Sequence, residues 1–122
     1  MTTIATFTGD IHQTDTVDER ELGLSGGTYS YSLKVWDGGN VHLKVEYYTG
    51  DQIGIGPDYV KGTWKTVEER IKVESDHTTT GSFSIPTVYL EDGVTKKGFN
   101  TRVKFSRGVL TKGANYSFVL ND

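Results

Sequence analysis

The stretch SGGTYSYSLKVWDGGNVHLKVEYY, residues 25–48, alternates apolar and polar side chains on both sides of a glycine-rich centre. Alternation with a period of two is typical of strands that bury one face. The central Asp-Gly-Gly-Asn, residues 37–40, readily adopts the positive φ angles of a tight turn. We therefore predict a hairpin whose two strands are joined by the three-residue loop 37–39. This hairpin would set Leu33 opposite Leu43 and Val35 opposite Val41.

The same alternation recurs along most of the chain, in short runs separated by turn residues, and no run has the length and periodicity of a stable helix. The sequence contains 15 Gly and only two Pro. We predict an all-β fold, a single antiparallel β-sandwich that is jelly-roll-like, with about 7–8 strands in one domain over residues 1–122. Residues 1–9 would form a short strand or an N-terminal arm. The other expected core residues are Phe83, Ile85, Phe99, Thr101, Val103, Phe105, Tyr116, Phe118 and Leu120.

Charge and composition argue against several classes of partner. Thirteen Lys and Arg against sixteen Asp and Glu give a formal net charge of −3, and the basic residues are spread along the chain. A phosphate backbone requires a clustered cationic face, so we expect no nucleic-acid partner. No stretch approaches the roughly 18 apolar residues of a membrane span, and the sequence as given has no signal-peptide pattern. The absence of cysteine suits assembly in a reducing cytosol.

Residues able to carry catalytic or metal chemistry are present but not grouped. His12, His42 and His77 lie far apart, without the short spacing of a metal site. The G-x-S-x-G pattern at residues 23–27 lacks the preceding strand and following helix of a nucleophile elbow. The acidic run at residues 15–21 offers oxygen ligands for calcium, but we favour a charged edge strand. We therefore expect no enzymatic activity, no metal and no cofactor.

Two aromatic residues of the opening stretch, Trp36 and Tyr48, fall on the polar faces of their strands. Exposed rings of this kind stack on sugars or anchor protein partners. They support an alternative function as a carbohydrate-binding, lectin-like module, including one that serves in host adsorption. Sandwiches also commonly bury a tryptophan, and we favour core packing for Trp36 and, more strongly, for Trp64.

Two irregular segments, residues 49–62 and 87–98, carry apolar side chains that a solvated loop has no reason to hold. Either these side chains contact a partner, or they fold back and cover the open ends of the sandwich. The candidate partner-binding residues are Ile53, Ile55, Tyr59, Val88 and Tyr89.

Turn and strand signals in the middle of the chain resemble the small all-β virion structural proteins of tailed bacteriophages. The resemblance covers residues 26–108 and is carried by Gly-Gly-Thr-Tyr at 26–29, Gly-Gly-Asn-Val-His-Leu at 38–43 and Gly-Thr-Trp-Lys-Thr-Val at 62–67, with TTTGSFSIP and GFNTRVKFSRG as closing strands.

This resemblance implies a head decoration or cement subunit, located in the virion and assembled in the host cytoplasm. Its implied partner is the major capsid protein or another virion protein. It also implies a homo-oligomer, a trimer being natural where three capsomers meet. The segments 49–62 and 87–98 depart from the pattern, which leaves head, tail and neck locations open.

Overall fold

The computed structural model describes residues 2–12, 17–50, 62–107 and 112–122, and these form eight strands and no helix. No membrane-crossing helix therefore occurs in this part of the chain. The strands are β1 (Thr3–Asp10), β2 (Val17–Ser25), β3 (Gly27–Trp36), β4 (Asn40–Tyr48), β5 (Trp64–Glu74), β6 (His77–Ile85), β7 (Gly98–Ser106) and β8 (Asn115–Asn121).

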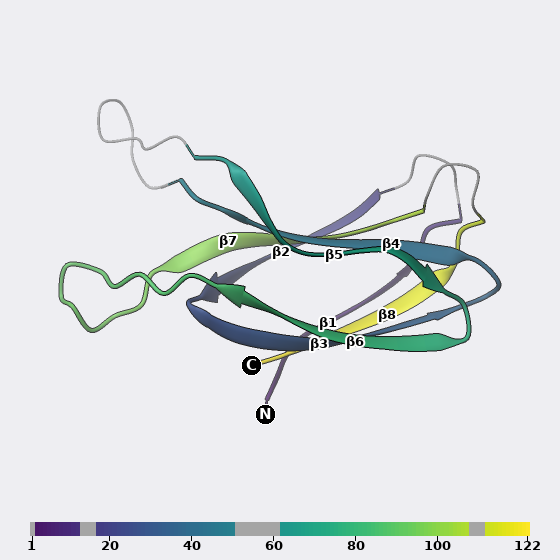
Figure 1. The fold of residues 1–122 in the computed structure, drawn as a ribbon, viewed down its shortest axis with the longest axis horizontal. Helices are drawn as coiled ribbons and strands as arrows, with labels where there is room; N and C mark the ends of the chain where they lie inside the picture. Colours follow the sequence, from purple (N-terminus) through teal and green to yellow (C-terminus); the bar gives the residue numbers. More distant parts are fainter. Residues whose placement is uncertain (1, 13–16, 51–61, 108–111) are drawn as a thin grey trace.

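The strands form two four-stranded antiparallel sheets that lie face to face (Figure 1). Sheet A has the order β1-β8-β3-β6 and sheet B the order β2-β7-β4-β5. The first strand therefore pairs with the last, the second with the seventh, the third with the sixth and the fourth with the fifth. This nested pairing is that of a jelly roll. The predicted antiparallel sandwich is confirmed.

The core lies between the sheets and is formed by the residues that alternation predicted. Leu33, Val35, Val41 and Leu43 are completely buried. The centre is aromatic, with the Phe105 and Tyr116 rings stacked at a centroid distance of 4.0 Å. The expected side chains of the later strands are buried as well: Phe83, Ile85, Phe99, Thr101, Val103, Phe105, Tyr116, Phe118 and Leu120.

The hairpin predicted for residues 25–48 is wrong, because β3 and β4 belong to different sheets. Leu33 and Leu43 both point inward, but from opposite sheets. The loop has the predicted three residues, with φ of 80° at Asp37 and 82° at Gly38. Its outgoing end is fixed elsewhere, since the Asn40 amide donates to the Lys112 carbonyl at 2.9 Å. Alternation fixes which side chains of a strand face the core, but not which strand lies beside it.

The N-terminal residues, for which a strand or an arm was expected, form edge strand β1 of sheet A. β1 pairs with β8, from Thr3 opposite Asn121 to Asp10 opposite Asn115, with one irregularity between Thr3 and Ala5. The chain ends of this structure lie side by side (Figure 1), where the Asp122 amide donates to the Thr2 carbonyl at 3.0 Å.

Each open side of the sandwich carries an acidic and an arginine side chain that point inward from an edge strand of sheet B. On one side, Asp18 and Arg20 of β2 pair in register with the buried Phe105 and Val103. The Tyr116 hydroxyl donates to Asp18 Oδ2 at 2.8 Å. Arg20 donates to the Thr8 carbonyl at 3.0 Å, so this arginine ties sheet B to the edge of sheet A.

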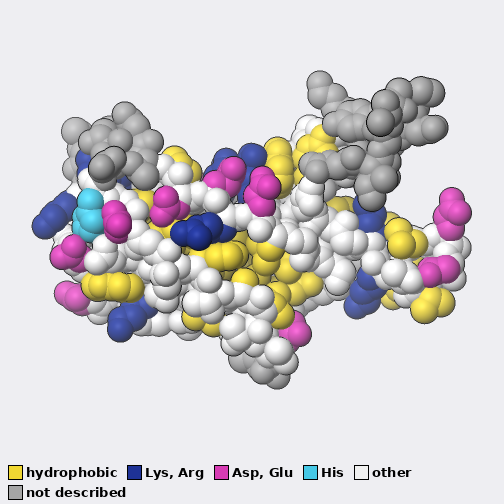
Figure 2. All heavy atoms as spheres, turned by 180° about the vertical axis from the view of Figure 1, so that it is seen from behind, with side chains coloured by type: hydrophobic (Ala, Val, Ile, Leu, Met, Phe, Trp, Pro, Cys, Tyr) yellow, Lys and Arg dark blue, Asp and Glu magenta, His cyan; other side chains and the backbone are white. Residues whose placement is uncertain are grey.

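The opposite side repeats this arrangement with Glu68 and Arg70 of β5, which face the core because they pair with Val45 and Leu43. The Tyr31 hydroxyl donates to Glu68 Oε2 at 2.8 Å and accepts from Arg70 Nε at 3.2 Å. Figure 2 shows the molecule from behind, with hydrophobic side chains along its middle and charged side chains beside them. Charged side chains thus cover the flanks of the core.

Candidate functional site

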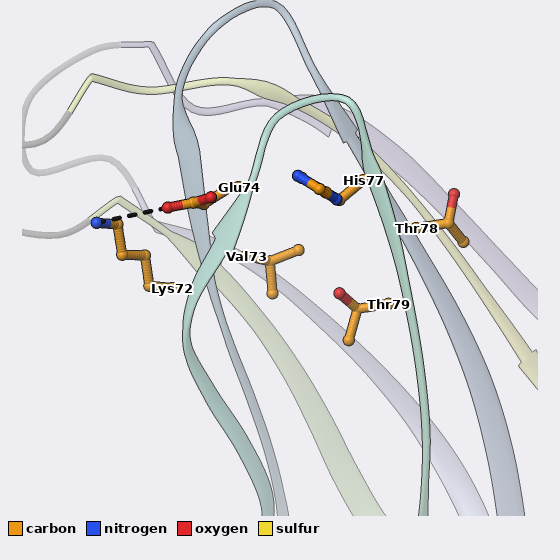
Figure 3. Close-up of a pocket in the computed structure, with 6 residues that line it drawn as sticks. All are labelled: Lys72, Val73, Glu74, His77, Thr78 and Thr79. Atoms are coloured by element: carbon orange, nitrogen blue, oxygen red, sulfur yellow. Dashed lines mark ion pairs between the residues drawn. The ribbon is translucent and has the colours of Figure 1, made fainter.

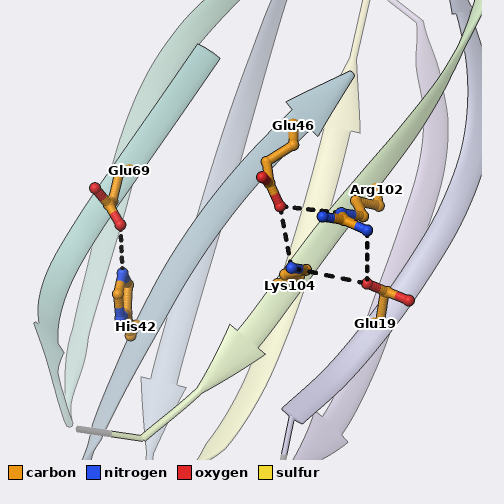
Figure 4. Close-up of polar contacts among 6 residues, drawn as sticks. All are labelled: Glu19, His42, Glu46, Glu69, Arg102 and Lys104. Atoms are coloured by element: carbon orange, nitrogen blue, oxygen red, sulfur yellow. Dashed lines mark hydrogen bonds and ion pairs between the residues drawn. The ribbon is translucent and has the colours of Figure 1, made fainter. Parts of the chain in front are cut away.

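The outer face of sheet B carries a charge cluster centred on Glu46 of β4 (Figure 4). Glu46 is only 6% exposed. Its Oε1 accepts from Arg102 Nε at 3.0 Å and lies 3.1 Å from Lys104 Nζ, both on β7. Glu19 of β2 adds a second carboxylate, 3.7 Å from Arg102 and 4.0 Å from Lys104. Two acids and two bases from three adjacent strands neutralise one another.

The pKa of Glu46 reflects two opposed effects. Burial alone would raise the pKa of this carboxyl, because it disfavours the charged form. The hydrogen bonds from Arg102 and Lys104, together with their positive charges, lower it, and the net pKa lies below the ordinary value for glutamate. Glu46 is therefore held ionised between two cations, which suits a structural role better than proton transfer.

An aromatic pair continues this cluster toward one end of the sheet. The Arg102 guanidinium lies over the Trp64 ring at 3.9 Å, and the Trp64 and Tyr48 rings are 5.3 Å apart. The Tyr48 hydroxyl accepts from the Gly62 amide at 3.0 Å. Trp64 is half-buried on this outer face, and Trp36 is 36% exposed. The expectation that either tryptophan packs in the core is wrong, because tyrosine and phenylalanine fill that volume.

The two candidate glycan-binding residues do not form a common site. Trp36 ends β3 on the outer face of sheet A, whereas Tyr48 ends β4 on the outer face of sheet B. The faces point in opposite directions, so one sugar cannot contact both rings. The structure places Trp64, and not Trp36, beside Tyr48.

The candidate partner-binding residues fall in two places. Ile53, Ile55 and Tyr59 lie outside the described residues. Val88 and Tyr89 lie in the connection between β6 and β7, where both side chains are exposed. These two therefore do not fold back over the core.

The segment that holds Val88 and Tyr89, residues 88–97, is here called the hairpin tip. Tyr89 pairs with Lys96 in an antiparallel bridge, and the Leu90 amide donates to the Thr95 carbonyl at 2.8 Å. Asp92 accepts from the Val94 amide at 2.9 Å and the Thr95 amide at 2.8 Å. The Thr95 hydroxyl and these amides lower the pKa of Asp92. The tip is thus held by its own hydrogen bonds, with exposed apolar side chains at Val88, Tyr89, Leu90 and Val94.

The three histidines occupy three separate places. His12 Nε2 lies 3.0 Å from Asn115 Oδ1 and 3.2 Å from Asp37 Oδ2. His42 Nε2 lies 2.9 Å from Glu69 Oε2 on the outer face of sheet B (Figure 4). His77 lines a shallow pocket at the turn between β5 and β6.

The surface formed by the described residues has two shallow hollows lined in part by β6. The first, about 250 Å³, includes His77, Thr78 and Lys72, and in it Glu74 pairs with Lys72 at 3.6 Å (Figure 3). The second, about 420 Å³, is lined by uncharged residues of β3 and β6 with Asn121. The first hollow holds a hydroxyl, an imidazole and a carboxylate, at Thr78, His77 and Glu74, but no hydrogen bond joins these three groups. The described lining of the second contains no His, Asp or Glu.

The acidic run does not form a ligand cluster where the structure describes it. Asp18 points inward to Tyr116, whereas Glu19 points outward to Arg102 and Lys104. Among the described residues no three His, Asp or Glu side chains are grouped as metal ligands. Asp15 lies outside the described residues.

The sequence analysis missed the Glu46 cluster and the two inward pairs. A signal for the pairs was present: the tripeptides Asp-Glu-Arg at 18–20 and Glu-Glu-Arg at 68–70 occupy matching positions on the two edge strands of sheet B. In both tripeptides the first and third side chains face the core. The middle glutamate, Glu19 or Glu69, makes its polar contact on the outer face of the sheet.

Comparison with known proteins gives a distant likeness in fold. No family model and no curated protein matches the chain. A chain in the structure of infectious bursal disease virus, Gx strain, is similar with a TM-score of 0.44 at 11% identity. A chain of the Gt strain gives 0.43 at 8%. Both matches cover 95% of this chain and only 30% of the viral chain. A likeness at this level assigns no function.

Proposed function

We propose that this chain is a structural subunit of a virion that acts through protein–protein contacts. More finely, we propose a capsid decoration or cement subunit of a tailed bacteriophage, bound to the major capsid protein or another virion protein. In this role the subunit bridges neighbours and works by contact rather than by catalysis. Many copies multiply weak contacts into stability of the particle.

The hairpin tip carries this proposal. A solvated domain has no reason to fix a turn with its own hydrogen bonds while exposing Tyr89 at 54% and Val94 at 78%. Such a preformed projection with exposed apolar side chains loses little conformational freedom when it binds, which favours its use as an anchor. The jelly roll agrees with this role, because the fold is frequent among viral capsid domains, although it also occurs in lectins.

The test replaces two exposed side chains of the tip, Tyr89→Ser with Leu90→Ser, and measures binding to purified phage heads that lack this subunit. We expect the melting temperature to stay within a few degrees and binding to fall at least about tenfold, as anchor residues typically contribute about 1.4 kcal/mol or more. The matched control, Val17→Ser with Ile71→Ser, also removes two exposed apolar side chains, but from strands away from the tip. Unchanged binding by the tip variant would contradict the proposal.

The carbohydrate-binding alternative is tested with the same proteins. It predicts glycan binding that is lost on Trp36→Ala or on Tyr48→Ala. Because the two rings lie on opposite faces, only one of the two variants should lose binding. Glycan binding that survives in the tip variant would favour the lectin-like function over the virion role.

A further inference from the structure

The four edge strands of the sandwich differ in how their free edges are protected. Edge strands expose unpaired backbone groups, and proteins usually guard them with charges, bulges or covering side chains. β2 has inward charges at Asp18 and Arg20. β5 has inward charges at Glu68 and Arg70, and its pairing with β4 shifts register twice. β1 has a register irregularity, and Arg20 occupies its Thr8 carbonyl.

β6 carries none of these guards in its own sequence, although the Tyr31 hydroxyl and the Glu68 carboxylate lie against Gly81 on the inner side. Its sequence, HTTTGSFSI, contains no Asp, Glu, Lys, Arg or Pro, and Pro86 comes only after the strand. All nine residues pair with β3 in unbroken register, from Gly27 opposite Ile85 to Val35 opposite His77. β3 is the sole strand neighbour of β6 among the described residues. The strand is therefore long, regular and open on its other side.

The sequence of β6 is suited to pair with itself. If two copies meet antiparallel about a twofold axis at Gly81, Thr80 of each copy lies opposite Ser82 of the other. In the same register Thr78 faces Ser84. All four side chains are exposed on the outer face of sheet A. Facing hydroxyl side chains are favourable cross-strand pairs, and one such pair already exists, between Thr28 and Ser84 at 3.1 Å.

The outer face of sheet A also permits this junction because it is almost free of charge. Three rows of paired residues cross the four strands, and Lys34 is the single charged residue in them. On this outer face, two copies joined at the β6 edge bring no like charges together. The rows are Thr3–Asn121–Ser30–Ser82, Thr6–Val119–Ser32–Thr80 and Thr8–Ser117–Lys34–Thr78.

We propose that a second copy of this chain docks on β6, so that the two β6 strands pair antiparallel about a twofold axis at Gly81. The two copies of sheet A then form one continuous sheet of eight strands. Such an interface is isologous and closes at the dimer. The proposal rests on the edge geometry and not on the virion role, so either can fail without the other.

The test introduces like charges at the junction with Thr80→Lys and Ser82→Lys in one chain, which places lysine opposite lysine twice. The matched control is Thr6→Lys with Thr8→Lys, which adds the same two charges, at the same spacing and on the same face, but on the opposite edge strand β1. Light scattering coupled to size exclusion should give twice the 13.5 kDa chain mass for the wild type and the control. The β6 variant should show a dissociation constant raised roughly tenfold or more.

A rescue variant separates charge repulsion from misfolding. Thr80→Lys with Ser82→Glu places opposite charges across the junction and should restore the dimer. Circular dichroism and melting temperature verify the fold of every variant. The cysteine-free chain also allows the register to be tested: a mixture of Thr80→Cys and Ser82→Cys chains should cross-link by disulfide more than either variant alone.

Several outcomes overturn the proposal. The wild type could remain a monomer at the highest concentration at which it stays soluble, or form a trimer. The β6 and β1 variants could associate equally. A rescue variant that stays monomeric while folded would contradict the Gly81-centred register.

Discussion

Glu46 is a carboxylate that is almost completely buried although it lies on the outer face of sheet B. Its partners Arg102 and Lys104 sit two residues apart on the neighbouring strand, so both project to the same side. A buried ion pair is weak evidence for stability in itself, because removing the charges from water costs free energy. Removal of one charged group of the cluster should nevertheless lower the free energy of unfolding, because the remaining charges are left uncompensated.

The Glu46 cluster gives a pH-dependent prediction. A carboxyl whose pKa is lower in the folded state contributes stability above its unfolded pKa, and this contribution is lost as the pH falls through the folded pKa. The wild type should therefore have a larger free energy of unfolding than Glu46→Gln at neutral pH. This difference should shrink as the pH is lowered past 4.5, the ordinary pKa of glutamate. Urea unfolding from neutral pH downward measures this. Glu21→Gln, an exposed glutamine exchange on the same face, is the control, and identical pH profiles for the two variants would contradict the prediction.

At the level of the strands, the sequence predicted correctly which side chains face the core, but it did not predict which strands pair with each other. Tyr31 and Leu33 alternate clearly enough to be placed inside, and both are buried. The partner of β3 could not be predicted, because the turn at 37–39 has the composition of a hairpin and its direction depends on contacts with residues far along the chain, such as Lys112. The charge cluster could not be predicted either, because its residues come together only when β2, β7 and β4 pair in the correct register.

The inward pairs on the edge strands also give a prediction. Tyr116→Phe removes the hydroxyl that donates to the inward-facing Asp18, so the free energy of unfolding should fall by about 1–3 kcal/mol. The pKa of Tyr116 is raised, first by burial and then by Asp18, so this hydroxyl remains a donor at neutral pH. Denaturant unfolding measures the change.

The control for this exchange is Tyr47→Phe. Tyr47 is also buried in the core, and its hydroxyl has no hydrogen bond to another described residue. Its loss should change stability by about 0.5 kcal/mol or less. Equal losses for the two variants would mean that the Asp18 contact contributes nothing.

At the scale of the whole molecule, the sandwich separates its surfaces by chemistry. The outer face of sheet B is charged and internally paired, the outer face of sheet A is mainly hydroxyl-bearing, and the hairpin tip exposes apolar side chains among charged ones. The proposed self-association uses the edge of sheet A at β6, and the proposed partner contact uses the hairpin tip. The sequence showed the apolar segment, but the two faces become visible only once the strands are assigned to their sheets.

The whole fold should not depend on a metal ion. The acidic residues of β2 are directed to different partners, Asp18 to Tyr116 and Glu19 to Arg102 and Lys104. We therefore expect EDTA to leave the melting temperature unchanged in calorimetry. A clear decrease that added calcium reverses would point to the run at residues 15–21 and contradict this expectation.

The nested pairing has a consequence for synthesis on the ribosome. β4 and β5 are neighbours in the sequence and can pair early, whereas β8 inserts between β1 and β3, which are made long before it. Until residues 115–121 have been translated and have left the exit tunnel, β1 has no partner in sheet A, and the edge of β3 that pairs with β8 remains open. Such long-range pairing is slow and leaves apolar surface exposed meanwhile. We therefore expect the nascent chain to need protection from aggregation until β8 has been made.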